Sequence, residues 1–315
     1  MNIGNTQHNA ILSVSSGRGP VQMASRGDAP PASHATRLLG IWRLGDAIHQ
    51  GPQSRLWAAQ PSDSVGSPRW DYVIRSVPGD GCENRGESVA QLQRFVAAAS
   101  AARHPHLVAV LDAALDSAEP YLVMPRLSDR SLADVLRSGS AQPLPVVLWL
   151  VRQTAEAAAA LHQAGFIHGD IKPENVLVSS RGHATLVDLG FARPIGQPGD
   201  GVFRGSIAYA APECVDGQTP ANASADSFSL GRLLWQLLSL TDKNATTAAG
   251  IDAVADLIAD LVDPAASKRP SAEQLAGRLV RLEIETLGCH IRPGRPTGQQ
   301  AGKAATESDR PRRAA

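Results

Sequence analysis

The segment His168-Gly-Asp-Ile-Lys-Pro-Glu-Asn175 combines side chains that could act together on a phosphate group. Phosphoryl transfer needs a carboxylate that orients the attacking hydroxyl, a cation against the transferring phosphate and oxygen ligands for a divalent metal. Asp170 supplies the carboxylate, and Lys172, two residues further on, can point the same way toward the phosphate. The segment therefore indicates a loop that could carry out phosphoryl transfer.

Two oxygen-bearing side chains near this loop could hold a divalent metal. Asn175 offers a neutral amide oxygen, which suits a hard cation such as Mg²⁺. Asp188, in Asp188-Leu-Gly190, follows Asn175 by one predicted hairpin, which brings its carboxylate back beside that oxygen. The spacing therefore fits a metal site next to Asp170.

The elements that must position these residues change type near Leu127. Before it, apolar stretches interrupted by glycine predict strands, and one stretch with apolar residues at helical spacing predicts a helix. We expect the strands within residues 38–59, 70–77, 107–115 and 120–124, and the helix at residues 87–103.

The second half of the chain is mostly helical. We expect helices at residues 131–137, 145–164, 224–240, 250–261 and 272–285, and a hairpin of two short strands at residues 175–178 and 184–187. A small sheet-rich lobe followed by a larger helical lobe is an α+β arrangement with a cleft between the lobes.

Composition limits the class of protein. The chain is 43% hydrophobic and 19% charged, which is typical of globular proteins, and its formal net charge of zero gives no case for a nucleic-acid surface or a polybasic membrane anchor. Its three cysteines, Cys82, Cys214 and Cys289, are too far apart for a CxxC metal pair, and they fit a reducing cytosol. No apolar stretch reaches the length of about 18 residues that a membrane helix needs. We therefore expect a cytoplasmic protein with no membrane segment.

The two ends of the chain have the composition of disordered tails. Residues 1–36 are rich in Ser, Gly, Asn and Pro and lack the basic start and apolar core of a cleaved export signal. A leader for specialised secretion is the alternative interpretation of this segment. Residues 286–315 contain Pro, Gly, Gln and Arg without periodicity and form the second predicted tail.

In order and spacing, the motifs resemble those of the protein kinases, and Lys172, two residues after the aspartate, resembles their serine/threonine branch. The resemblance implies the bilobal kinase fold, with the N-lobe at residues 37–126 and the C-lobe at residues 127–285. It also implies that Asp170 is the catalytic base and Lys172 the phosphate-side cation. The metal ligands would be Asn175 and Asp188, and the chain would use ATP with Mg²⁺ or Mn²⁺.

The stretch Gly205-Ser-Ile-Ala-Tyr-Ala-Ala-Pro-Glu213 resembles the substrate-positioning loop of that family. The resemblance implies that the Ser206 hydroxyl hydrogen-bonds to Asp170 and Lys172. It implies protein substrates, because this loop is the part of the kinase fold that receives them.

Three more residues extend the resemblance through the second half. Glu213 would be buried and would need a cationic partner, and Arg269 stands where the family places that partner. Asp226 matches the helix aspartate that braces the catalytic loop.

The nucleotide side of the resemblance is less regular. The family covers the ATP phosphates with Gly-x-Gly-x-x-Gly, because only glycine allows such close backbone approach, but the aligned positions here are His49, Gly51 and Ser54. Besides the residue at the position of the phosphate-binding lysine, the resemblance implies five nucleotide-contacting residues. They are Gly51, Leu56, Met124, Leu127 and Leu177.

Arg75 stands where the family has the lysine that grips the α- and β-phosphates. The glutamate that usually partners this lysine would align with Phe95, and residues 88–111 contain no acidic residue. Arg75 is either a drift toward arginine with function retained or a sign that nucleotide binding has decayed.

Two departures concern regulation. Gly169 replaces the arginine that many kinases neutralise with a phosphate on the activation loop, and residues 189–205 contain no Ser, Thr or Tyr. We therefore predict a kinase that does not depend on activation-loop phosphorylation. The short segment 241–250 lacks the usual longer insertion with a substrate-docking helix, which puts ordinary substrate docking in doubt.

Three functions fit these residues. The first is transfer of the ATP γ-phosphoryl group to protein serine or threonine, which the intact Asp170, Lys172, Asn175 and Asp188 favour. The second is a pseudokinase, a signalling or scaffold module, which the degenerate glycine turn, Arg75 and Phe95 favour. The third is a small-molecule kinase of related fold, which the substrate-positioning loop disfavours.

Overall fold

The computed structural model describes residues 37–291 except 52, 80–83, 128–129 and 242–247, and side chains as far as Leu287. The predicted tail at residues 1–36 and most of the second one, residues 292–315, lie outside the described residues. The last helix extends past the predicted boundary at residue 285, because α6 runs over Ala272–Ile291.

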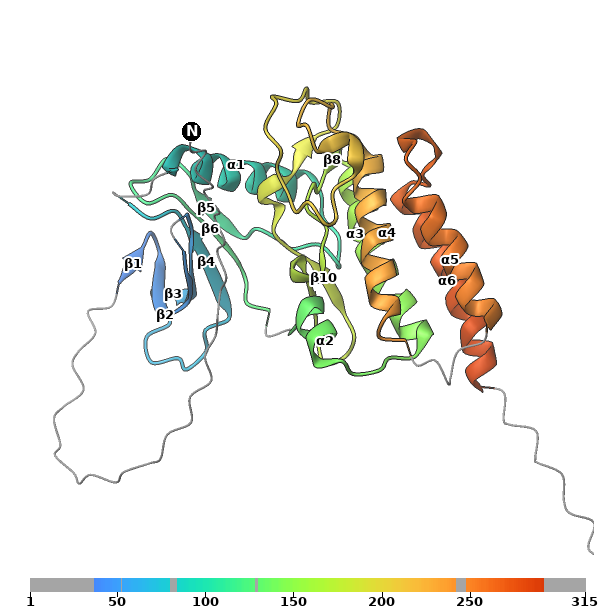
Figure 1. Cartoon of the computed structure of the whole chain (residues 1–315). Helices are drawn as coiled ribbons and strands as arrows, with labels where there is room; N and C mark the ends of the chain where they lie inside the picture. Colours follow the sequence, from blue (N-terminus) through green and yellow to red (C-terminus); the bar gives the residue numbers. More distant parts are fainter. Residues whose placement is uncertain (1–36, 52, 80–83, 128–129, 242–247, 292–315) are drawn as a thin grey trace, which may run out of the picture. The chain divides into compact units, whose positions relative to one another are not determined.

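The first part of the fold is a six-stranded sheet in the order β1-β2-β3-β4-β6-β5, with every neighbouring pair antiparallel (Figure 1). Its strands are β1 (Leu38–Leu39), β2 (Trp42–Gln50), β3 (Arg55–Pro61), β4 (Tyr72–Ser76), β5 (Asp112–Ala114) and β6 (Tyr121–Pro125).

Strand β4 shows how the sheet separates its core from its functional face. Ile74 is fully buried in a cluster with Trp42, whereas Val73 and Arg75 line a cavity. Successive residues of a strand point to opposite faces, so burial of Ile74 directs both neighbours toward the cavity. Helix α1 (Arg85–Ala101) follows, and its Phe95 is buried.

The strand expected at residues 107–115 is wrong over its first half, because only β5 within it is a strand. Leu107 instead forms an isolated parallel bridge with Leu186, and Val108 N donates to Leu186 O at 2.9 Å. Both Leu107 and Val108 belong to the larger core cluster, so burial there outweighs continuation of β5.

The second part is helical and is built around α3 (Leu144–Gln163), which packs against α4 (Ala223–Leu238) and α6. The other elements here are α2 (Leu132–Ser138), α5 (Ala248–Leu261), the short sheet of β7 (Arg130–Ser131), β9 (Val176–Val178) and β10 (Ala184–Leu186), and the pair β8 (Phe166–Ile167) and β11 (Arg193–Pro194). Single 3₁₀ turns lie at Pro173–Asn175, Leu189–Phe191, Pro212–Cys214 and Ala266–Lys268.

Among the described residues, α3 alone is long and apolar enough to cross a membrane by length and composition. However, 72% of its most apolar window is buried inside the fold, as expected for the central helix of a helical lobe. Its alanines explain both properties, since small side chains allow α4 and α6 to approach closely.

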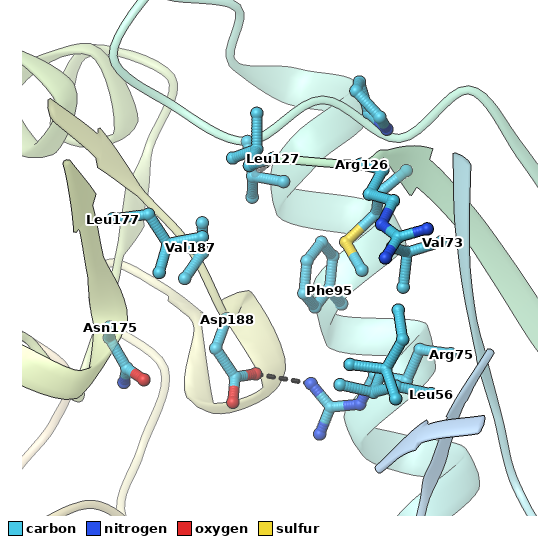
Figure 2. A pocket seen from close by; sticks show the side chains of 14 residues that line it. Leu56, Val73, Arg75, Phe95, Arg126, Leu127, Asn175, Leu177, Val187 and Asp188 are labelled. Atoms are coloured by element: carbon cyan, nitrogen blue, oxygen red, sulfur yellow. Dashed lines mark hydrogen bonds and ion pairs between the residues drawn. The ribbon is translucent and has the colours of Figure 1, made fainter. Parts of the chain in front are cut away.

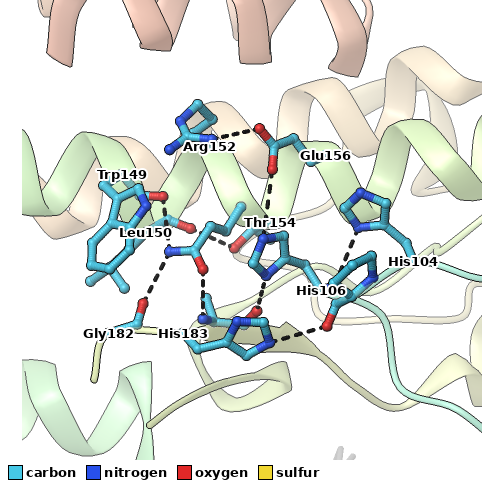
Figure 3. A network of polar contacts seen from close by, with 12 residues as sticks. His104, His106, Trp149, Leu150, Arg152, Thr154, Glu156, Gly182 and His183 are labelled. Carbon is cyan, nitrogen blue, oxygen red and sulfur yellow. Dashed lines mark hydrogen bonds and ion pairs between the residues drawn. The ribbon is translucent and has the colours of Figure 1, made fainter. Parts of the chain in front are cut away.

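A cluster of polar side chains joins the segment after α1 to α3 and to the β9–β10 hairpin (Figure 3). The ring of His106 lies 5.4 Å from that of His104 and 4.5 Å from that of His183, measured between centroids. His106 Nε2 faces Glu156 of α3 at 3.7 Å, and Glu156 also pairs with Arg152 at 2.6 Å. The cluster therefore links the segment after α1 to the helical part of the fold.

Candidate active site

Asp226, at the start of α4, holds the backbone of the catalytic loop, as the sequence predicted. Its Oδ2 accepts from His168 N at 2.7 Å and lies 2.8 Å from His162 Nε2, and its Oδ1 accepts from Gly169 N at 2.9 Å. Burial by itself would raise the pKa of this fully buried carboxyl, but the hydrogen bond and charge of His162 lower it. Asp226 therefore remains ionised, and it fixes the catalytic loop by accepting hydrogen bonds from two of its backbone N–H groups.

Asp170 is buried, and its two oxygens have different surroundings. Oδ2 lies 2.7 Å from Lys172 Nζ and accepts from Asn175 Nδ2 at 3.0 Å. Oδ1 is buried and has no hydrogen-bond partner within the described residues. An unpaired buried acceptor is costly, so Oδ1 is suited to a hydroxyl group that arrives with a substrate.

Lys172 links Asp170 to the substrate-positioning loop. Its Nζ donates to Ser206 Oγ at 2.7 Å while it contacts Asp170 Oδ2 at 2.7 Å. The predicted Lys172–Ser206 bond is confirmed, whereas no direct bond from Ser206 to Asp170 is found among the described residues. Ser206 is thus held beside Asp170 through the lysine.

Asn175 and Asp188 fit a hard divalent cation. Asn175 donates its Nδ2 to Asp170 O at 2.8 Å and to Oδ2 at 3.0 Å, so its carbonyl oxygen is left for another partner. Asp188 has a left-handed backbone, with φ of 63°, fixed in part by the bond from Gly190 N to its Oδ1 at 3.2 Å. Both side chains line one cavity, so two oxygen-bearing groups of the kind that Mg²⁺ prefers face the same space.

That cavity has a volume of about 480 Å³ and lies between the sheet and the catalytic loop (Figure 2). Five of the predicted nucleotide-contacting residues line it: Leu56, Arg75, Met124, Leu127 and Leu177. Its other lining residues are Ile48, Val73, Phe95, Val108, Pro125, Arg126, Asn175, Val187 and Asp188. The lining is apolar except for arginines and oxygen-bearing groups, an arrangement that suits a flat apolar base carrying phosphates.

Gly51 lies elsewhere. It sits in the turn between β2 and β3, where its N donates to Ser54 O at 2.9 Å, and it does not line the cavity. Its contact with a nucleotide stays a prediction.

A sequence profile of the protein kinase domain matches residues 80–249, more than half of the chain. The chain belongs to the protein kinase family. The match begins after β4, so Arg75 lies outside it.

The chain also resembles several bacterial serine/threonine kinases. A probable serine/threonine-protein kinase of Bifidobacterium longum is 29% identical over 280 residues, covering 80% of this chain and 37% of that protein. The kinase PknL of Mycobacterium tuberculosis is 36% identical over 137 residues, covering 42% of this chain and 34% of PknL. PkaA of Streptomyces coelicolor is 28% identical over 280 residues, covering 78% of this chain and 50% of PkaA. The matches thus span between a third and a half of these relatives.

Arg75 of this kinase domain has partners that the sequence did not predict. Its NH1 donates to Asp188 Oδ1 at 2.6 Å (Figure 2). Its NH2 makes a long contact of 3.5 Å with Gln91 Oε1 of α1. Burial would raise the pKa of Asp188, but the charge and hydrogen bond of Arg75 lower it.

The assignment of Phe95 to the partner position on α1 is therefore wrong. Phe95 is buried at the cavity wall, and Gln91, one helical turn earlier on the same side, faces Arg75. A count backward from His104 cannot fix the rotation of α1. The signal that could have identified Gln91 is its long polar side chain, four positions before the aromatic Phe95 on the same face of the helix.

A row of charges, also absent from the sequence predictions, connects α1 to the segment after Asp188. Arg94 Nε donates to Gly190 O at 2.8 Å, and Arg94 NH2 pairs with Glu87 at 2.5 Å. Glu87 lies 3.8 Å from Arg204, which binds both carboxylate oxygens of Asp200, at 2.9 and 2.8 Å. These contacts hold α1 against residues 189–205, the activation segment of the kinase.

Glu213 and Arg269 form the ion pair that the sequence predicted, but Glu213 is only partly buried, not buried as expected, because it lies in the short turn Pro212–Cys214 at the surface of the loop. Arg269 NH1 and NH2 bind the two oxygens of Glu213 at 2.6 and 2.9 Å, and the arginine side chain is completely buried. Burial would raise the pKa of Glu213, but Arg269 lowers it. The pair fixes the end of the substrate-positioning loop to the helical lobe.

Proposed function

We propose that this chain transfers the γ-phosphoryl group of ATP to serine or threonine residues of a protein substrate. The observation that supports this most directly is the unpaired Oδ1 of the buried Asp170, beside a loop that Lys172 holds through Ser206. An acceptor without a partner at this position suits the hydroxyl of a substrate.

Each residue then has a separate task. Asp170 Oδ1 accepts the hydrogen bond of the attacking hydroxyl and takes its proton as the phosphate bond forms. Lys172 contributes positive charge on the phosphate side. Asn175 and Asp188 would hold Mg²⁺, which when bound neutralises charge on the phosphates. Arg75 lines the same cavity from β4.

The test compares wild type with Asp170→Asn, using labelled ATP with Mg²⁺ or Mn²⁺ and either autophosphorylation or a serine/threonine peptide mixture. We expect the variant to lose roughly 10²–10⁴-fold in rate and to keep its melting temperature, since the exchange is nearly isosteric. Asp252→Asn, an exposed position on α5, is the matched control and should be unaffected. Measurable and equal transfer by wild type and Asp170→Asn would show that the base is misassigned.

We also propose that activity does not require phosphorylation of the activation segment. Gly169 has φ of 79°, and a Cβ added there would lie 2.8 Å from Phe191 O. The backbone at this position therefore disfavours the arginine that binds the activation-loop phosphate in many kinases. The contact of Arg204 with Glu87 joins α1 to the segment without any phosphate.

The second candidate is a pseudokinase, and one observation favours it. Arg75 is engaged with Asp188, and its contact on α1 is a neutral amide at 3.5 Å. A pseudokinase of this kind would bind nucleotide weakly or not at all and give no transfer in the Asp170 experiment, with wild type and variant equally silent.

A further inference from the structure

An arginine stacked on an exposed tryptophan lies on α4 beside the substrate-positioning loop. The guanidinium carbon of Arg232 is 4.4 Å from the ring centroid of Trp235, three residues further along the helix. Trp235 is 55% exposed, which is high for so large an apolar side chain. The stacking restricts the arginine to one side of the ring and so preorganises its charge.

These two residues form one wall of a separate cavity of about 420 Å³. Its lining consists of Ala208, Tyr209, Arg232, Trp235, Gln236 and Ser239. Two contacts join helix and loop there: Arg232 Nε donates to Ala208 O at 3.1 Å, and the Tyr209 hydroxyl donates to Gln236. The cavity is therefore continuous with the loop that begins at Ser206, next to Asp170.

The charge of Arg232 is not neutralised. Within the residues that the structure describes, no carboxylate lies within ion-pair distance of Arg232, whereas Arg269 and Arg278 each have one. Among the described residues, Nε alone has a hydrogen-bond acceptor, so the two terminal nitrogens are available as donors. Glu174 acts on Tyr209 from nearby but makes no ion pair with Arg232.

We propose that Arg232 and Trp235 form a subsite for an acidic side chain of the protein substrate, close to the serine or threonine that accepts the phosphate. A planar guanidinium binds a carboxylate through two parallel hydrogen bonds, and the ring of Trp235 covers the apolar part of the incoming residue. The inference rests on the proposed function, because the loop at Ser206 leads a substrate chain past this cavity.

The first experiment measures transfer to a peptide library with a central serine, in which one flanking position at a time is Asp, Glu, Ala or Lys. For wild type we expect kcat/KM to be roughly three- to tenfold higher with Asp or Glu than with Ala at one flanking position. Arg232→Glu should reverse the ranking in favour of Lys, and Arg232→Lys should retain the acidic preference. Trp235→Ala should weaken it. Arg281→Glu makes the same charge change on an exposed part of α6 and should leave the ranking as in wild type.

The second experiment measures binding of the Asp, Ala and Lys peptides by fluorescence anisotropy, so it needs no turnover. If wild type phosphorylates no peptide, the proposed function fails, and the binding ranking alone decides the subsite. An equal ranking of Asp and Lys peptides in wild type would overturn the subsite, as would an acidic preference that Arg232→Glu leaves unchanged. A ranking, unlike a rate, does not change when a substitution merely loosens the loop.

Discussion

Arg75 and Asp188 lie 113 residues apart in sequence and form an ion pair at 2.6 Å, although one was expected on phosphates and the other on a metal. Arg75 is mostly buried and Asp188 about one-third exposed, so the pair occupies the polar end of the cavity without closing it. Arg75 and Asp188 thus engage each other at the position where the kinase resemblance places phosphates and a metal.

The first prediction concerns this pair. A ligand at about a hundredfold over its Kd adds about 2.7 kcal/mol of stability, or roughly 5–10 °C in melting temperature for a domain of this size. We expect a smaller shift with ATP that requires Mg²⁺ or Mn²⁺, because Arg75 is already paired with Asp188 and its wide planar group is not a conservative replacement for a compact ammonium group. Arg75→Ala should abolish the shift, and Arg75→Lys should raise affinity or turnover.

Thermal melting with and without ATP and metal checks this prediction, and the exposed Arg69→Ala serves as its control. If metal-bound ATP does not shift the melting temperature and Arg75→Ala does not change this result, nucleotide is not a ligand. The pseudokinase interpretation then replaces the kinase one.

The second prediction concerns activation. Phosphatase-treated protein should begin transfer at its full rate, without a lag. Arg204→Ala should lower the rate roughly two- to fivefold, since it removes the exposed ion pairs that join Asp200 and Glu87. Progress curves after phosphatase treatment measure both effects. Arg181→Ala, an exposed position in the β9–β10 hairpin, is the control. A lag that preincubation with ATP removes would contradict this prediction, unless the phosphate maps to Ser206 or to a tail.

The third prediction concerns the Glu213–Arg269 pair. Arg269→Ala leaves a partly buried carboxylate without its partner and should cost about 3 kcal/mol, or roughly 6–12 °C in melting temperature. Arg278→Ala removes an arginine from an exposed pair with Asp260 and should cost less than about 1 kcal/mol. A similar loss of melting temperature in the two variants would show that burial of Arg269 does not increase the contribution of its ion pair to stability.

The same pair makes a pH-dependent contribution with a defined sign. Because Arg269 lowers the pKa of Glu213 below its ordinary value of 4.5, the stabilisation is complete above pH 4.5 and is lost as pH falls toward the folded-state pKa. The stability difference between wild type and Arg269→Ala should therefore shrink below pH 4.5, as measured by urea unfolding.

The fourth prediction concerns His106. Burial, more than the neighbouring His183, lowers its pKa from the ordinary value of 6.5, although the hydrogen bond to Ala184 O at 2.8 Å and Glu156 oppose this. The neutral ring is thus favoured in the folded state, and stability should fall as pH drops below 6.5.

Melting temperatures between pH 8 and pH 5 measure this loss, which should be smaller in His106→Gln than in wild type. His49→Gln, at an exposed position on β2, should follow the wild-type curve. A steeper loss in His106→Gln would show that the ring gains stability on protonation.

The sequence by itself determined the loop of Asp170, the return of the chain to Asp188 and the order of the elements. Asp170, Lys172 and Asn175 lie within one short loop, and one hairpin returns the chain to Asp188, so local geometry brings them together. The Glu213–Arg269 pair was also predictable, because each residue belongs to a recognisable motif.

The tertiary structure alone decided the partners of residues that meet across the fold. Gln91 rather than Phe95 faces Arg75 because the rotation of α1 is set by packing of its apolar side, and a shift of one turn preserves the same helical spacing. The contact between Glu87 and Arg204 and the cavity at Arg232 and Trp235 depend on how separate elements approach one another. Spacing along the chain carries no information about such approaches, because they are fixed by the packing of side chains that are distant in sequence.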